Sequence, residues 1–201
     1  MSKYFVSIVL ITFQTWVGAV QDSPGIVQHK ATEHTHIGIF PNELLDHVHE
    51  KEKLDEFTDL WRQGGTPFTI QDDIQIQRWE KVVWNVAWNS LTTLTMLNTH
   101  AWLSSSDNAT PLTKKLMQEV ISVAQGAGVP LKDSLTDTLI ARILAMTPIG
   151  SSMQVDCKME RKMEVDIILG TAVRKGKELG ISTPTLDVLY TLLLAVNSRM
   201  K

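Results

Sequence analysis

Three polar residues recur at intervals of four inside an apolar stretch of the chain: Lys81, Asn85 and Asn89. An α-helix turns about 100° per residue, so this spacing places the three side chains on one face. The residues at 82–84 and 86–88 are all apolar, which is typical of a buried helix. An unpaired buried polar group costs about 1–3 kcal/mol. The pattern therefore predicts either a cleft for a small anionic ligand or a solvated stripe on a half-buried helix.

The elements that must position these residues fall into two parts. The first part predicts β-structure with one helix: strands near 4–12, 25–30 and 34–40, a helix capped by Asn42 over roughly 43–62, and a strand at 66–70. From residue 71 onward the pattern is helical. We therefore expect domains at residues 1–70 and 71–201.

The helices of the second part are predicted from apolar periodicity and from glycine or proline at their ends. The helix of Lys81 is expected to continue to about residue 97, before a loop at 104–111. Further helices are expected at 112–128, 133–145 and 157–179, with residues 150–156 as a connection, and a last helix starts at Thr183-Pro184.

Composition excludes some classes of function. The net charge of −3 gives no indication of a nucleic-acid partner. The single Cys157 excludes an internal disulfide and favours a reducing compartment, the cytoplasm. Residues 4–20 fit either a buried strand or a secretory signal, and their β-branched residues favour the strand. The run is too short and interrupted for a membrane-spanning helix, so no membrane partner is expected.

Two kinds of ligand site are missing from the sequence. No Gly-x-Gly-x-x-Gly follows a predicted strand, so the glycine-rich loop that binds the pyrophosphate of a dinucleotide is absent. The histidines that invite a metal interpretation are His29, His34, His36, His47 and His49. Their His-x-His spacing is not that of helical ligands and no cysteine joins them, so we expect no metal site.

Four stretches of the chain resemble the ketopantoate reductase (2-dehydropantoate 2-reductase) family, mainly its C-terminal helical domain. They are residues 79–92 with the Lys81, Asn85 and Asn89 ladder, then Asn98, then residues 151–156 followed by Glu164 and Gly170, then residues 180–185 leading to Tyr190. The Ser-Ser-Met element with a glutamate twelve residues after Ser152 is the most specific. The resemblance covers about residues 4–201 and is strongest from residue 66.

The resemblance implies a mostly α fold. An all-helical C-terminal domain of the 6-phosphogluconate dehydrogenase type would follow a small α/β remnant of a Rossmann domain. The predicted strands would be the last strands of that Rossmann domain. Its glycine-rich loop and first βαβ units are absent from this chain.

The chemistry that the resemblance implies is NADPH-dependent reduction of ketopantoate to pantoate, towards pantothenate and coenzyme A. Lys81 would be the general acid that stabilises and protonates the developing oxyanion. Glu164 would lie near the cofactor and would keep Lys81 charged. Substrate contacts are implied for four residues: Asn85, Asn89, Asn98 and Ser152.

Each of the last assignments has a plainer alternative. Ser152 could be a helix N-cap or a turn hydroxyl, and Glu164 a surface charge. Asn98 could be a residue at a helix C-terminus. Asp166 and Asp156 fit structural roles, and Gly170 is expected to allow close helix contact.

Two departures from the family pattern affect the functional hypothesis. Leu169 stands where the family commonly has asparagine, and Ser90 replaces the usual proline. They suggest a reductase of the same family that acts on a different 2-oxo acid. Because the nucleotide-binding half is missing, we expect impaired activity and weak NADPH binding by this chain alone. The alternative function is a non-catalytic remnant that binds a partner or forms a homodimer through an apolar helix face.

Overall fold

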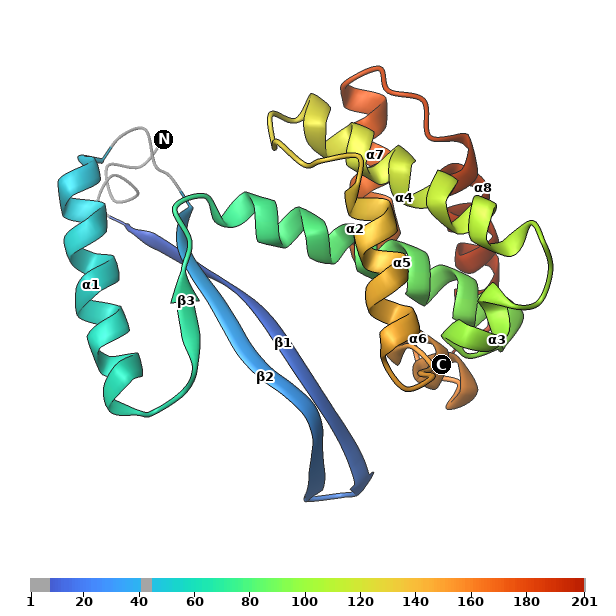
Figure 1. Ribbon diagram of the computed structural model, residues 1–201, viewed down its shortest axis with the longest axis horizontal. Helices are drawn as coiled ribbons and strands as arrows, with labels where there is room; N and C mark the ends of the chain where they lie inside the picture. The colour runs from blue at the N-terminus through green and yellow to red at the C-terminus, as the bar shows by residue number, and fades with distance from the viewer. Residues whose placement is uncertain (1–7, 41–44, 201) are drawn as a thin grey trace. The chain divides into compact units, whose positions relative to one another are not determined.

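The structure is a computed structural model that describes residues 8–40 and 45–200. Two compact units make up the chain, residues 1–78 and residues 79–201. Helix α2, Ile74–Thr95, begins in the first unit and continues into the second (Figure 1). The domain boundary predicted at residue 70 stays a prediction.

A three-stranded sheet in the order β1-β2-β3 forms the centre of the first unit. Strands β1, Leu10–Ser23, and β2, Ile26–Phe40, form an antiparallel hairpin, and β3, Phe68–Ile70, pairs in parallel with β2. Pro24 and Gly25 make the hairpin turn, and Gly25 adopts a φ of +83° that suits glycine.

The strand predictions are partly corrected by this hairpin. The segments predicted at 25–30 and 34–40 form one strand, because β1 continues to pair with β2 across residues 31–33. The predicted strand at 4–12 falls partly on residues 4–7, which lie outside the described residues; its described end belongs to β1. Strand β3 occupies the last three residues of the predicted 66–70 strand.

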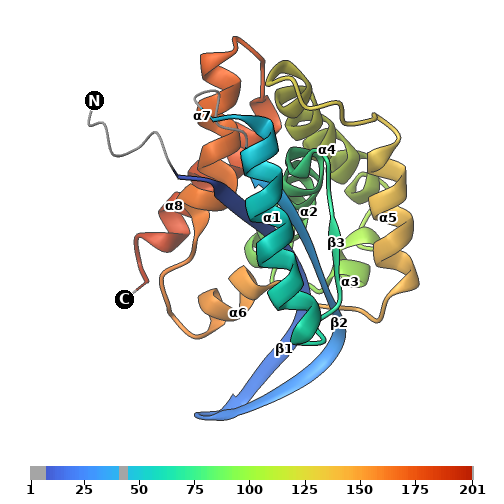
Figure 2. The same ribbon diagram turned by 90° about the vertical axis from the view of Figure 1, so that its left-hand side faces the viewer.

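Helix α1, His47–Gln63, links β2 to β3 and lies along one face of the sheet (Figure 2). Phe13 of β1 packs against Phe57 and Trp61 of α1, with ring centroids 5.5 and 5.4 Å apart. These contacts bury the apolar stripe of an otherwise polar helix.

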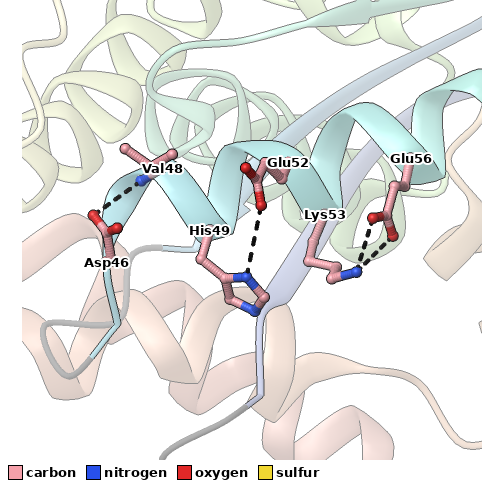
Figure 3. Close-up of polar contacts among 6 residues, drawn as sticks. All are labelled: Asp46, Val48, His49, Glu52, Lys53 and Glu56. Carbon is pink, nitrogen blue, oxygen red and sulfur yellow. Dashed lines mark hydrogen bonds and ion pairs between the residues drawn. The ribbon is translucent and has the colours of Figure 1, made fainter.

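The start and outer face of α1 are held by local polar contacts (Figure 3). The Val48 backbone N–H donates to the Asp46 carboxylate at 3.2 Å, so Asp46 is the N-cap. On the outer face, Lys53 forms an ion pair at 2.7 Å with Glu56, which lies about one turn after it. The predicted cap, Asn42, lies outside the described residues.

The second unit is helical, which confirms the mostly α fold with a helical C-terminal region. Beyond α2 its elements are α3 Thr99–Leu103, α4 Ala109–Gly126, α5 Leu135–Ala145, α6 Ser152–Lys158, the π-helix η1 Asp166–Gly170, α7 Thr171–Glu178 and α8 Pro184–Asn197. The buried Glu119 of α4 accepts hydrogen bonds from the Thr185 and Leu186 N–H groups at 3.1 and 2.9 Å, and so caps α8.

The region between residues 150 and 179 differs most from the prediction. Residues 152–156, expected in a connection, belong to α6, and the helix expected at 157–179 is interrupted after Lys158. Glu160 has a φ of +55°, which cannot continue a right-handed helix. The Asn197 carboxamide then holds Met163 in place, because it accepts from the Met163 N–H at 2.8 Å.

Two smaller predictions concern the loop at 104–111 and Cys157. Helix α4 already begins at Ala109, inside the predicted loop, and α3 precedes it. Cys157 is buried and unbonded. In the described part of the chain, no helix has both the length and the apolar character needed to cross a membrane.

Candidate active site

Helix α2 carries Lys81, Asn85 and Asn89 on one face, as the spacing predicts. Lys81 and Asn85 are half-buried, and Asn89 is only 4% exposed. The opposite face is closed by core side chains with no exposed surface: Val83, Val86 and Ala87. The helix is therefore fixed in the core on one side while its polar stripe lies at the edge of that core.

The environment of Lys81 changes its acidity. Burial lowers the pKa of Lys81, because desolvation penalises the ammonium form. A lowered pKa brings proton donation nearer to neutral pH, which suits a general acid.

The two asparagine amides have unused hydrogen-bonding capacity. Neither the Asn85 nor the Asn89 side chain forms a hydrogen bond with another described residue. Asn89 as a whole is almost enclosed, whereas Asn85 is half-buried. Each amide therefore offers donors and an acceptor to a ligand at this face.

One side of the stripe is closed by aromatic packing. Trp84 and Trp88 meet edge to face with ring centroids 5.8 Å apart, and the Arg142 guanidinium of α5 lies 5.2 Å from the Trp84 centroid. Burial raises the pKa of Glu80, and the nearby Arg142 opposes that rise. Arg142 therefore couples α5 to the turn of α2 that carries Lys81.

The N-terminus of α6 is tied to the far end of the stripe. The Thr92 hydroxyl donates to the Ser151 hydroxyl at 2.8 Å, and the Ser151 oxygen accepts from the Gln154 N–H at 3.0 Å. The Gln154 carboxamide donates to the backbone oxygens of Thr92 and Leu97 at 2.8 and 2.9 Å. Thr92 lies one helical turn beyond Asn89, so these bonds bring α6 next to the end of the ladder.

Ser152 is the first residue of α6 and its side chain is exposed. The N-cap is Ser151, so the alternative interpretation of Ser152 as a cap is wrong. The Thr92–Ser151 bond places Ser152 near the turn that follows Asn89. Its contact with a substrate carboxylate stays a prediction.

Asn98 has a structural role at the start of a helix. Its side-chain oxygen accepts from the Ala101 N–H at 2.8 Å and caps α3. The alternative interpretation, a residue at a helix C-terminus, is wrong, because the chain turns after α2 and starts a new helix here. Its contact with substrate stays a prediction. The capping bond uses only the side-chain oxygen, so the amide NH₂ group is left to donate to a substrate.

Glu164 lies in the segment between α6 and η1, with its side chain exposed. Its backbone oxygen accepts from the Ile168 N–H at 3.0 Å. The Glu164 carboxylate forms no hydrogen bond or ion pair with another described residue. The predicted support of the Lys81 charge by Glu164 therefore stays a prediction.

The two departures from the family pattern lie in the core. Leu169 and Ser90 have no exposed surface, and the Ser90 hydroxyl donates to the Val86 backbone oxygen at 2.6 Å. Any effect of these residues on a ligand would act through packing, because their side chains are enclosed.

Four histidines of the first unit have protein partners. His34 and His36 share one face of β2, and both contact the Thr69 hydroxyl, at 2.6 and 3.2 Å. His47 and His49 pair with Glu50 and Glu52 along α1. Within residues 8–40 and 45–200, no group of three or more His, Cys, Asp or Glu side chains is arranged to hold a metal ion.

The helix N-termini that follow strands do not suit a dinucleotide. Helix α1 is capped by Asp46, and at the start of α2 the Gln75 N–H donates to the Asp73 carboxylate at 2.9 Å. A phosphate needs these N–H groups and is repelled by carboxylates there. These two helix N-termini therefore do not fit the pyrophosphate of NADPH.

Sequence reasoning missed the residues that connect α2 to α6: Thr92, Ser151 and Gln154. Thr92 lies three residues after Asn89 and so falls on the same helix face, which was the available signal. The partners of Thr92 are about sixty residues away along the chain, at 151 and 154. No local pattern indicates a contact of that range.

Comparison with known proteins identifies the family. The family model described as "Ketopantoate reductase PanE/ApbA C terminal" matches residues 73–197, more than half of the chain. The chain therefore belongs to the ketopantoate reductase family.

Individual relatives agree with this assignment. A 2-dehydropantoate 2-reductase from Nostoc sp. is 27% identical over 148 residues, which cover 74% of this chain and 46% of that protein. A crystal structure of 2-dehydropantoate 2-reductase from Methylococcus capsulatus is 28% identical with a TM-score of 0.81, and the match covers 94% of this chain and 63% of that one. The chain spans about half the length of the curated relatives it matches.

Two more distant structures share the fold. One is a dimeric ketopantoate reductase from Staphylococcus aureus, 22% identical with a TM-score of 0.79, covering 94% of this chain and 62% of that one. The other is D-mandelate dehydrogenase in complex with NADH, 22% identical with a TM-score of 0.81, covering 95% and 63%.

Proposed function

We propose that this chain carries the substrate side of a ketopantoate reductase, which reduces the ketone of 2-dehydropantoate to the alcohol of pantoate in the cytoplasm. The observation that carries the proposal is the stripe on α2: a partly buried ammonium followed by two amides with free hydrogen-bonding groups. These groups suit 2-dehydropantoate, because it presents a carboxylate, a ketone oxygen and a hydroxyl.

Lys81 acts as the general acid in this proposal. Negative charge grows on the ketone oxygen as the carbonyl carbon accepts a hydride, and an ammonium held at the edge of the core stabilises that charge. The lowered pKa of Lys81 eases transfer of its proton to the oxygen.

The other polar residues orient the substrate. Asn85 and Asn89 hydrogen-bond the hydroxyl and oxo groups one and two turns beyond Lys81, and Ser152 binds the carboxylate. The Thr92–Ser151 bond supports this placement, because it holds the N-terminus of α6 near the end of the stripe. Asn98 is a further substrate contact through its NH₂ group.

The chain supplies little of the cofactor site. NADPH is the hydride donor of the proposed reaction, and NADH is bound in D-mandelate dehydrogenase, which has the same fold. Glu164 is the one cofactor contact proposed here. Helices α1 and α2 begin with acidic residues, so we assign pyrophosphate binding to a separate nucleotide-binding region. The relatives are about twice as long as the matched segment, which leaves room for such a region in them.

Turnover in a restored enzyme tests the proposal. The chain is fused to the nucleotide-binding region of the Methylococcus capsulatus enzyme. The rate of NADPH oxidation in the presence of ketopantoate is then compared between this fusion and its Lys81→Ala variant. General acids contribute about 10²–10⁴-fold to rates, so the variant should lose turnover on that scale. Lys115→Ala, an exposed lysine on α4, is the matched control. Equal turnover with Lys81→Ala would remove Lys81 from the acid role.

A second candidate function, a non-catalytic dimerising module, is favoured by the surface of α8. Val188 and Leu192 lie one turn apart and are 59% and 50% exposed. Such a pair on one helix face can form part of an interface between copies, and the Staphylococcus aureus relative is described as dimeric. Light scattering after size exclusion should give a dimer that Leu192→Glu dissociates, and a monomeric wild type would exclude this function.

A further inference from the structure

Asp166 is the centre of a polar cluster at the start of the π-helix η1. Its carboxylate accepts a hydrogen bond from the Tyr190 hydroxyl at 2.6 Å and an ion-paired hydrogen bond from the Arg174 guanidinium at 2.7 Å. Arg174 also donates to the Asp166 backbone oxygen at 3.3 Å. The cluster therefore joins three elements, η1, α7 and α8, through one side chain.

Gly170 leaves the space in which this cluster forms. A Cβ at Gly170 would lie 2.6 Å from the Asp166 carboxylate, 2.9 Å from the Arg174 guanidinium and 3.0 Å from the Tyr190 hydroxyl. The first two distances are too short for a carbon atom and the third is tight, so the ends of these side chains would have to shift. The close contact expected at Gly170 is thus a contact with the polar ends of three side chains, those of Asp166, Arg174 and Tyr190.

The cluster acts on an unusual piece of backbone. A π-helix is rare and is found mostly as single turns, frequently at functional sites. Here η1 covers Asp166–Gly170, and the Ile168 N–H donates to the Glu164 backbone oxygen at 3.0 Å. The backbone of Glu164 is therefore bound to the same turn that Asp166 anchors.

The Glu164 side chain has no polar partner in the described part of the chain. It is exposed and forms no hydrogen bond with another described residue. The position of its carboxylate consequently depends on the backbone that the π-turn provides.

We infer that Asp166, Arg174 and Tyr190 are positioning residues: together they fix the π-turn and through it set where the Glu164 carboxylate lies. The part of this inference that concerns the cofactor rests on the proposed function, since that proposal makes Glu164 a cofactor contact. The cluster touches neither substrate nor cofactor in this account.

The protonation states favour the cluster near neutral pH. The hydrogen bond from Tyr190, and then that from Arg174, lower the pKa of Asp166. The bond to Asp166 raises the pKa of Tyr190. The carboxylate is thus charged and the phenol protonated over the range in which the contact is needed.

Two readouts that do not depend on turnover test the inference. The chain has two tyrosines, so Tyr4→Phe makes Tyr190 the only phenol, and its phenolate absorbance is followed against pH. A nitroxide label at Glu164→Cys, in a Cys157→Ala background, reports the mobility of position 164. Asp166→Asn should lower the Tyr190 pKa towards its ordinary value and should increase label mobility.

Matched variants separate the outcomes. Asp156→Asn breaks a similar surface pair, Asp156–Arg161, and should change neither readout. Gly170→Ala and Tyr190→Phe should raise label mobility too, which covers the case in which Asp166→Asn fails to fold. Unchanged mobility in a folded variant with a lowered Tyr190 pKa would overturn the inference. A different outcome is that the variants raise label mobility while the fused enzyme with the unchanged chain does not reduce ketopantoate. That outcome would leave the positioning inference intact and refute the proposed function.

Discussion

At the scale of single residues, the chemistry depends on how α2 divides its surface. Core packing on one side leaves Lys81 partly desolvated, while Asn85 and Asn89 keep unused hydrogen-bonding groups. The residue types and their spacing were predictable, because a four-residue repeat depends only on helix geometry. The capping roles of Asn98 and Ser151 were not, because each depends on where a helix starts.

Lys81→Met should change how stability depends on pH. The folded-state pKa of Lys81 is lowered, so as pH rises the native state loses this proton before the unfolded state does. Stability then rises with pH between that lowered value and the ordinary lysine pKa of about 10.4. Wild type should gain free energy of unfolding relative to Lys81→Met over this range in urea denaturation. A difference that stays constant with pH would contradict the lowered pKa.

At the scale of elements, the sequence predicted helices whose periodicity is local. The helix of the ladder, the helix ended by glycines near residue 126 and the last helix from Pro184 are all confirmed. The break after Lys158 was not predicted, because it depends on the positive φ of Glu160 and on Asn197, 34 residues beyond Met163. The π-turn likewise depends on Tyr190 of another helix.

Ser151→Ala should destabilise the helical unit. The change removes the N-cap of α6 and the acceptor for Thr92, and a lost cap costs typically about 1 kcal/mol and up to about 2. Ser152→Ala is the matched control, because that exposed side chain forms no hydrogen bond with a described residue, and it should change stability by less than about 0.5 kcal/mol. Urea unfolding of the three proteins measures both effects, and equal losses for the two variants would contradict the assignment of the cap.

At the scale of the whole molecule, the family was predictable from short motifs in order along the chain. The sheet hairpin was harder to predict, because residues 31–33 separate the two predicted strands, whereas β1 pairs with residues 31 and 33 and so joins the strands into one. The sequence also lacks a glycine-rich phosphate loop, and the structure shows acidic residues at both helix starts that follow strands.

NADPH should therefore bind poorly to this chain alone. Carboxylates at the starts of α1 and α2 disfavour a pyrophosphate. The sequence also has no Gly-x-Gly-x-x-Gly after a predicted strand. Calorimetric titration at high protein concentration should show no saturable heat. Micromolar affinity would contradict this expectation.

The most direct test of the central claim is a titration of the side-chain amide resonances with pantoate, followed by NMR. If the face of α2 binds a small hydroxy or oxo acid, the amides of Asn85 and Asn89 and the backbone amide of Ser152 should shift in a saturable way. The amides of Asn108 and Asn197, which lie elsewhere in the helical unit, should not move. No shift at Asn85 and Asn89, or an equal shift at all four asparagines, would contradict the account.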